Sequence, residues 1–420
     1  MRITELQENV EAIELFKNLL DNNKEALSKS LTVDTWIPFS ANAAQLERGI
    51  ATLKNYHKNA SLLETRMPLG GIAIFSSYND PYFGTLGMSM VAALLVNGVK
   101  RQIVMKFPTA LEQTSILLDN IIQGSGDFPN VSISSLEGKE FMDYYFSDEN
   151  TGVIQVYGGP WVRKYTDHPK KFGKALRFEG PGNNPAIVHA SANLEEAADR
   201  IIHMAYILSG QACVVTKRVI VDDAIDRNKF DALLENSVSS LKVGENPFEE
   251  VYVSSLKNSG VIKRLNEQIN EALEGQVKTY NLNRKDAIIE GIKGMFMTPT
   301  IFYDPDTSLR IFNEESFAPV MTVNYAKESD LVKIANSTPY RLTASVFGVE
   351  KTVQPLIKEL KKSHGMVMLN NTSNEMVTCN EGYIGPWGGK GVSSFYIGPD
   401  NDWKLTQDEA HLAQNFTKRI

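Results

Sequence analysis

The sequence predicts an α/β protein of two lobes, in each of which crossover helices connect the strands of a parallel sheet. Three observations predict this fold class. Short apolar runs alternate with segments of helical periodicity from residue 66 onward, the alternation continues through the second half, and a glycine- and proline-containing segment at 180–182 separates the halves. Such alternation favours parallel strands, because a parallel pair needs the long connection that a helix supplies.

The first half contains the segments expected for one such lobe. Roughly the first 55 residues have apolar side chains at intervals of three and four, which is typical of amphipathic helices. Helical periodicity returns at 85–97 and 111–122, and glycines follow both segments. Short apolar runs bounded by turn residues predict strands at 70–75, 102–106, 131–133 and 153–157.

The second half repeats the pattern. Apolar runs predict strands at 186–188, 218–221, 295–302, 320–325, 344–347 and 365–370. Helical spacing predicts helices at 194–208, 230–241, 256–273, 331–336 and 353–363.

Composition excludes several classes of function. The chain has 420 residues, of which 42% are hydrophobic and 22% charged, as in an ordinary globular protein. Its formal net charge of −7 argues against nucleic acid as a partner. The sequence has no apolar run long enough to span a bilayer and no signal-peptide core at its start, so we expect a cytoplasmic protein with no membrane partner.

The cysteines and histidines do not indicate a disulfide framework or a metal site. The two cysteines, Cys213 and Cys379, are too few for either a disulfide scaffold or a four-cysteine zinc site. The six histidines form no cluster with the spacing of metal ligands. We therefore expect no metal.

Three residues occur where reactive groups are expected. Cys213 follows a predicted helix, where backbone N–H groups could stabilise its thiolate, and the alternative is a buried, inert thiol. Glu179 lies on a turn rich in glycine and proline and is either a general base or a solvated charge. Asn79 follows the carboxyl end of the first predicted strand and is either an oxyanion donor or an ordinary turn residue.

Gly158 and Gly159 follow another predicted strand. Glycines in this position allow a phosphate to approach the backbone. The sequence that follows them, Pro-Trp-Val-Arg, lacks the spacing of a dinucleotide-binding motif. The signal for a phosphate loop is therefore weak.

Several segments, in the same order, resemble the aldehyde dehydrogenase superfamily. Glu-Gly-Pro-Gly-Asn-Asn-Pro-Ala-Ile-Val at 179–188 is similar to the family's Glu-Leu-Gly-Gly-Lys-x-Pro-x-Ile-Val, and Gly-Gln-Ala-Cys at 210–213 is similar to its Gly-Gln-x-Cys. Glu179 and Cys213 have the family's separation, 213 − 179 = 34 residues. Glu-Glu-Ser-Phe-Ala-Pro-Val at 314–320 and the segment 67–81 give two further matches. The chain is thus identified as a divergent, shortened member.

The resemblance implies a Rossmann-type cofactor domain at 1–180, an α/β catalytic domain at 181–395 and an oligomerisation tail at 396–420 in a homodimer or homotetramer. It implies oxidation of an aldehyde to a carboxylic acid through a thioester, with NAD or NADP. Cys213 matches the nucleophile and Glu179 the base that activates water. Asn79 matches the oxyanion donor, together with the backbone N–H of Cys213.

The resemblance also implies which residues bind the cofactor. Lys106 matches the lysine that holds the adenosine ribose, and Glu112 resembles the ribose-binding glutamate of NAD-preferring members. Glu315 and Phe317 match the pair at the nicotinamide ribose. Three glycines stand where the family has other residues: Gly158 and Gly159 replace its pyrophosphate loop, and Gly180 replaces the leucine after the glutamate.

The residues near Asn79 depart from the family in ways that bear on the substrate. Tyr78 replaces its tryptophan and Asp80 its phenylalanine. The expected entrance to the site contains four apolar or aromatic residues, which suggests a partly apolar aldehyde: Tyr82, Phe83, Met88 and Met376.

Two other functions stay open at this point. The first is a reductase of acyl-CoA or acyl phosphate from the same superfamily, which shares the cysteine but needs no base for water. The second is a non-catalytic scaffold with this fold, which the altered glycine loop suggests. Retention of Glu179 with Cys213 favours hydrolysis over both.

Overall fold

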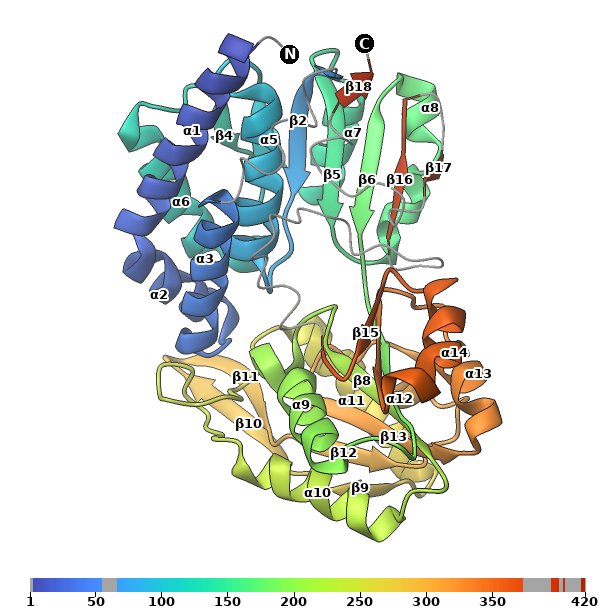
Figure 1. Ribbon diagram of the computed structural model, residues 1–420. Helices are drawn as coiled ribbons and strands as arrows, with labels where there is room; N and C mark the ends of the chain where they lie inside the picture. The colour runs from blue at the N-terminus through green and yellow to red at the C-terminus, as the bar shows by residue number, and fades with distance from the viewer. Residues whose placement is uncertain (1–2, 55–65, 373–393, 400–402, 405–416, 420) are drawn as a thin grey trace.

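The protein folds into two lobes, shown one above the other in Figure 1. We analysed a computed structural model, which describes residues 3–54, 66–372, 394–399, 403–404 and 417–419. Each lobe is built around a seven-stranded, mostly parallel sheet. The predicted α/β class is therefore confirmed.

The sheet of the upper lobe has the order β17-β16-β6-β5-β2-β3-β4. Its strands from β6 to β4 are parallel, and β16 lies antiparallel to β6. The strand bounds are β2 Gly71–Phe75, β3 Ile103–Lys106, β4 Val131–Ile133, β5 Thr151–Tyr157, β6 Ala175–Glu179, β16 Ser394–Ile397 and β17 Trp403–Lys404. A separate two-stranded ribbon pairs β1 (Arg66–Pro68) with β18 (Thr417–Arg419).

Helices cover both faces of the upper sheet. One face, with Ile72 and Ile74 of β2, packs against α1, α2, α3, α5 and α6 and the π-helix η2. The other face, with Ala73 of β2, packs against α7 and α8. The bounds are α1 Ile3–Asn22, α2 Lys24–Thr35, α3 Phe39–Lys54, η2 Pro81–Ser89, α5 Met90–Asn97, α6 Glu112–Ser125, α7 Gly138–Ser147 and α8 His168–Phe172.

The sheet of the lower lobe has the order β15-β14-β7-β8-β13-β12-β9. Its strands are parallel apart from β9, which runs antiparallel to β12. The bounds are β7 Asn184–Val188, β8 Thr216–Asp222, β9 Lys278–Tyr280, β12 Thr300–Tyr303, β13 Val320–Ala326, β14 Thr343–Phe347 and β15 Met366–Leu369. A hairpin of β10 (Arg284–Ile289) and β11 (Ile292–Met297) extends from this lobe.

Alternating side chains of the lower strands point into two cores. Helices α9 and α10 cover one face, and α11, α13 and α14 cover the other. The bounds are α9 Leu194–Tyr206, α10 Arg227–Ser240, α11 Ser259–Glu274, α12 Arg310–Asn313, α13 Leu331–Ala335 and α14 Glu350–Lys361.

The chain changes from the upper to the lower sheet between Glu179 and Asn184, at the end of the expected cofactor domain. Strand β16 starts at the end of the expected catalytic domain and, with β17, returns to the upper sheet. Within the expected 396–420 tail, the structure describes 396–399, 403–404 and 417–419. Cys379 and Met376 lie outside the described residues.

The structure differs from the predicted elements at several places; α7, β9 and β10, for example, lie in segments for which no element was predicted. The helix expected from residue 85 begins at Pro81 as a π-helix, because Asp80 accepts a hydrogen bond from the Phe83 N–H and caps it. The strand expected at 295–302 is two strands, β11 and β12. Strand β6 was not predicted, since charged residues interrupt its apolar positions.

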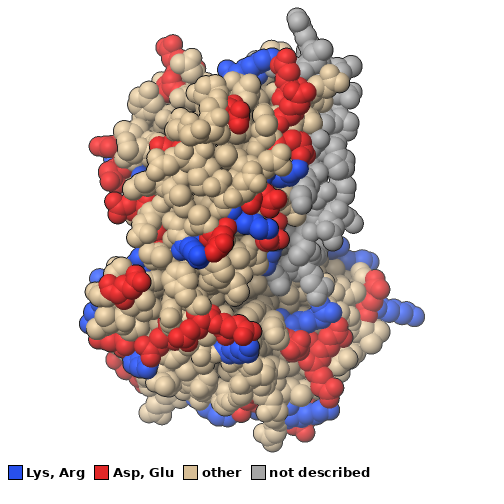
Figure 2. Space-filling view, turned by 90° about the vertical axis from the view of Figure 1, so that its left-hand side faces the viewer, with Lys and Arg blue, Asp and Glu red and all other residues tan. Residues whose placement is uncertain are grey.

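Charge is mixed on the surface. Acidic and basic side chains are interspersed over both lobes on the face shown in Figure 2.

None of the helices within the described residues combines the length and apolarity that a bilayer crossing demands.

Candidate active site

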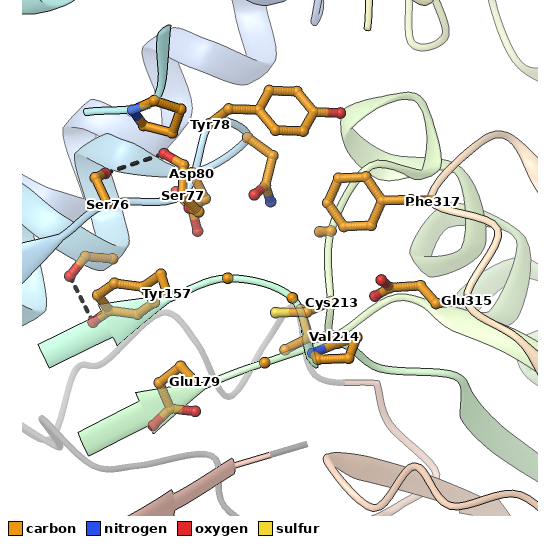
Figure 3. A pocket seen from close by; sticks show the side chains of 18 of the residues that line it. Ser76, Ser77, Tyr78, Asp80, Tyr157, Glu179, Cys213, Val214, Glu315 and Phe317 are labelled. Carbon is orange, nitrogen blue, oxygen red and sulfur yellow. Dashed lines mark hydrogen bonds between the residues drawn. The ribbon is translucent and has the colours of Figure 1, made fainter. Parts of the chain in front are cut away.

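A cavity of about 820 Å³ lies where loops from the two lobes meet. Cys213, Glu179 and Asn79 line it together, although they are far apart in the sequence. Five of the predicted cofactor residues line the same cavity, namely Gly158, Gly159, Gly180, Glu315 and Phe317. In Figure 3, Cys213 lies between Glu179 on one side and Glu315 on the other.

Cys213 lies in a constrained loop between α9 and β8. The three residues from Leu208 to Gly210 have positive φ values of 55°, 56° and 71°, so the chain turns sharply before the cysteine. Asn184 fixes the loop on the other side, because its Nδ2 donates to the carbonyl oxygens of Cys213 and Val215, each at 2.8 Å.

Gly182 packs directly against this loop. A Cβ atom on Gly182 would lie 1.8 Å from the carbonyl oxygen of Cys213. Its N–H donates to Oε1 of Glu315 at 2.8 Å. The interlobe segment therefore touches both the cysteine and the carboxylate, and only glycine fits there.

The surroundings of Cys213 disfavour its thiolate. Burial raises the pKa of Cys213 well above its usual value, and the negative charges of Glu315, Glu179 and Asp80 raise it further. Stabilisation of a thiolate by the backbone, one reading of the sequence, is the weakest of these influences. Proton removal must therefore accompany attack by the sulfur.

Glu179 is the last residue of β6 and forms a buried ion pair with Arg177 on the same strand. The two side chains share a face of the sheet because they are two residues apart. Glu179 is thus not the solvated loop charge that the sequence left open, since it is only 7% exposed.

Asn79 is also buried, and neighbouring elements hold its backbone. Gln45 of α3 donates to its carbonyl oxygen at 2.9 Å. The preceding Tyr78 donates from its hydroxyl to Oε1 of Gln211 at 2.6 Å, and its ring lies 5.9 Å from that of Phe317. These contacts connect the oxyanion candidate to the loop that contains Cys213.

Burial affects the acidic groups of the cavity. It raises the pKa of Glu315 to about 7, although the Gly182 hydrogen bond and Lys217 oppose the shift. It raises the pKa of Asp80 to about 6 against the influence of Arg48, which also lines the cavity. Two carboxyl groups of the site thus titrate near neutrality.

Lys217 connects the cysteine loop to the segment after Glu315. Its ammonium donates to the carbonyl oxygens of Gly210 at 3.0 Å, Val320 at 3.4 Å and Ala318. Burial lowers the pKa of Lys217 to about 7. Sequence reasoning missed this residue and Arg177, because no motif marks either.

The glycine pair faces cationic and aromatic side chains. The indole of Trp161 lies close to both glycines, about 3.4 Å from the Cβ position of Gly158. Lys139 and Lys164 also line the cavity, and the Lys164 ammonium lies 5.9 Å from the centroid of the Trp161 ring. Lys106 ends β3, is 8% exposed and is not among the residues that line the cavity.

The predicted entrance residues separate into two groups. Phe83 and Met88 line the cavity. Tyr82 does not: it is fully buried, and its hydroxyl donates to the carbonyl oxygen of Leu27 at 2.6 Å. The expectation that Tyr82 lines the entrance is therefore wrong, because the side chain extends from η2 to α2.

One group of possible metal ligands occurs in the described part of the chain. Ligand atoms of His189, Asp222 and Glu328 lie within 4.8 Å of one another. Asp222 already accepts hydrogen bonds from the N–H groups of Ala190 and Ala224. None of the three ligands lines the cavity, so we assign them no role in it.

Comparison with known proteins gives consistent matches. Residues 1–400 match the model of the "Aldehyde dehydrogenase family". The chain is 27% identical to a 1-pyrroline-5-carboxylate dehydrogenase of Oceanobacillus iheyensis over 78% of its length, and 29% identical to a benzaldehyde dehydrogenase of Bacillus subtilis over 73%. The matched segments span 66% and 62% of those relatives, less than two thirds of their length.

Solved structures share the fold. A mutant aldehyde dehydrogenase of Pseudomonas syringae, in complex with NAD⁺ and octanal, superimposes with a TM-score of 0.84. That match covers 99% of this chain and 84% of the other at 20% identity.

Proposed function

The chain belongs to the aldehyde dehydrogenase family, and from that premise we propose that it oxidises an aldehyde to a carboxylic acid with NAD or NADP. The observation that most supports the proposal is the presence of Cys213, Asn79 and Glu179 around one cavity. A thiol nucleophile, an amide donor and a carboxylate base are the groups that the two halves of this reaction require.

The first half of the reaction forms a thioester. The thiol of Cys213 gives its proton to solvent water as its sulfur bonds to the carbonyl carbon of the aldehyde, and the π electrons of the C=O bond move to the oxygen. The side-chain amide of Asn79 and the N–H of Cys213 donate to the oxyanion, and loss of one such donor typically costs about 10²–10³ in rate. When bound, a nicotinamide dinucleotide supplies the acceptor for the hydride that leaves this carbon.

The second half hydrolyses the thioester. Glu179 takes a proton from water, and the water oxygen bonds to the acyl carbon. The carbon–sulfur bond then breaks, which releases the carboxylic acid and restores the thiol of Cys213.

The residues around the cavity fit a nicotinamide dinucleotide. Lys139 and Lys164 line the same cavity as Gly158 and Gly159, and their positive charge would favour a pyrophosphate there. The carboxylate of Glu315 suits ribose hydroxyls. We propose that the cofactor is held by Lys106, Gly158, Gly159, Gly180, Glu315 and Phe317.

One observation favours a second candidate function. Because Glu179 is paired with Arg177, its availability as a base is restricted. A reductase of acyl-CoA or acyl phosphate would need the thiol and the cofactor but no base for water. A non-catalytic scaffold has less support, since it would have no use for the three reactive groups.

An aldehyde panel with NAD⁺ and NADP⁺, followed by absorbance of the reduced cofactor, tests the proposal. We expect oxidation to a carboxylate by the wild type and none by Cys213→Ala, with the same circular dichroism. Turnover that occurs only when coenzyme A or phosphate is added would favour the reductase. Turnover by Cys213→Ala would exclude the proposed nucleophile.

The proposal includes a homodimer or homotetramer, as the resemblance implies, and places it in the cytoplasm. Light scattering of the purified full chain measures the assembly, and a monomeric mass would contradict this part of the proposal.

A further inference from the structure

A buried arginine faces the proposed base. Arg177 is 1% exposed, and its Nη2 donates to Oε1 of Glu179. A cation so deeply buried is stable only beside a compensating group, and this carboxylate is one. Each of the two charges therefore constrains the other.

A residue of β5, one of the two strands beside β6, contacts the arginine. Gln155 of β5 lies opposite Arg177 and accepts from its Nη1 at 3.4 Å. Tyr157 lies opposite Glu179, yet its hydroxyl makes hydrogen bonds to Ser89 and to the carbonyl oxygen of Gly84, both at 2.9 Å. Glu179 ends its strand and lines the cavity, whereas Arg177 does not.

The orientation of Glu179 matches this arrangement. In Figure 3 its carboxylate points away from the sulfur of Cys213. A base for the thioester on Cys213 has to approach that sulfur's acyl group directly or through one water. In the ion pair, the carboxylate of Glu179 is thus turned away from the place where it would act as the base.

We propose that Arg177 is a positioning residue, which holds Glu179 against the sheet until the carboxylate turns toward the acyl-enzyme. The inference rests on the proposed function. An adjacent cation keeps a carboxylate ionised at lower pH and makes it a weaker proton acceptor. Arg177 therefore sets both the rate and the pH range of hydrolysis.

Glu179 shares its surroundings with other acidic groups. The charges of Glu179 and Asp80 act on Tyr157 and on Cys213. Loss of Arg177 would remove a positive charge that opposes the charges of these acidic groups. We therefore expect loss of Arg177 to move the acidic limb of the pH–rate profile for hydrolysis to higher pH.

The test uses p-nitrophenyl acetate, which requires neither cofactor nor a known aldehyde. The sulfur of Cys213 bonds to the acetyl carbon and p-nitrophenolate leaves, which gives a burst; water then hydrolyses the thioester in the steady state. The variants are Arg177→Gln, Arg177→Lys, Glu179→Gln and the double Arg177→Gln/Glu179→Gln. Lys174→Gln is the matched control, because Lys174 is a buried cation that donates to backbone carbonyls.

We expect the burst to persist in every variant. Arg177→Gln should move the acidic limb of the steady-state rate up by about 1–3 pH units, the range for removal of a neighbouring opposite charge. Arg177→Lys should fall between it and the wild type, since a single ammonium cannot reproduce a guanidinium's contacts. In the Lys174→Gln control, the acidic limb should stay at the wild-type pH. The double variant should have the same steady-state rate and pH dependence as Glu179→Gln.

Two outcomes would overturn the inference. The first is an acidic limb of the steady-state rate that stays at the wild-type pH in the folded Arg177 variants. The second is an effect of Arg177→Gln on that limb that is as large in Glu179→Gln as in the wild type. If Arg177→Gln does not fold, the acidic limb of Arg177→Lys is compared with that of the wild type. A limb at higher pH supports the inference, and a limb at the wild-type pH overturns it. Absence of the burst in the wild type would instead contradict the proposed function, so the two failures are distinguishable.

Discussion

At Gly182 the backbone passes so close to Cys213 that no side chain fits between them. We expect Gly182→Ala to lower the rate of aldehyde oxidation by about 10²-fold, since misplacement of a reacting group by 1 Å can cost that much. The physical cause is the Cβ position 1.8 Å from the Cys213 carbonyl oxygen. Gly124→Ala is the control, because a Cβ at Gly124 meets nothing within 4 Å; equal losses in the two variants would contradict this explanation.

Glu315 should make stability depend on pH. Its pKa rises from 4.5 to about 7 on folding, so the folded protein holds a proton that the unfolded chain releases over this range. The stabilisation from this proton is complete below pH 4.5 and is lost as pH rises through 7, by about 3 kcal/mol. Urea unfolding of the wild type and Glu315→Gln at pH 5 and pH 8 measures it, and a difference between the proteins that does not fall with pH would refute it.

Among single residues, the sequence predicted the groups that motifs mark and missed those that act through contacts. Cys213, Glu179 and Asn79 belong to ordered motifs, so they were found. Arg177 was missed because its meaning depends on β6 being a buried strand and on its register with Gln155 of β5. Lys217 was missed because two of its three carbonyl acceptors, Ala318 and Val320, lie 101 and 103 residues away in the sequence.

At the scale of elements, the contact between α3 and η2 positions Asn79. A Cβ on Gly87 of η2 would lie 2.7 Å from the Cα of Gly49, so the two helices touch through their backbones. We expect Gly87→Ala to push them apart and to destabilise the protein by about 1–3 kcal/mol, measured by urea unfolding.

Gly84→Ala in the same helix is the matched control. Its Cβ would meet the Tyr157 ring at 3.5 Å, an ordinary van der Waals distance. If both variants lost the same stability, close packing of the helix backbones would not be the cause.

Most elements were predictable because their periodicity is strong, and the exceptions have physical causes. The π-helix was not foreseen, since its extra backbone width depends on the Asp80 cap and on the packing of α3. The break between β11 and β12 follows from Pro299, which cannot donate to a sheet.

At the scale of the whole molecule, the site exists only because two lobes meet. The upper sheet supplies Asn79 and Glu179 at the ends of its strands, and the lower lobe supplies Cys213 and Glu315. Local patterns predicted the two lobes but not how they pack, which depends on long-range contacts such as that of Gly182 with Cys213 and Glu315.

The proposed function depends on a covalent acyl intermediate on Cys213 that Glu179 hydrolyses. The most direct test is peptide mass spectrometry of Glu179→Gln after reaction with NAD⁺ or NADP⁺ and the aldehyde that the wild type oxidises fastest. We predict one acyl group on Cys213, absent when Cys213 is also replaced by alanine. An acyl group on Cys379 instead, or carboxylate produced at the wild-type rate with no adduct, would contradict the claim.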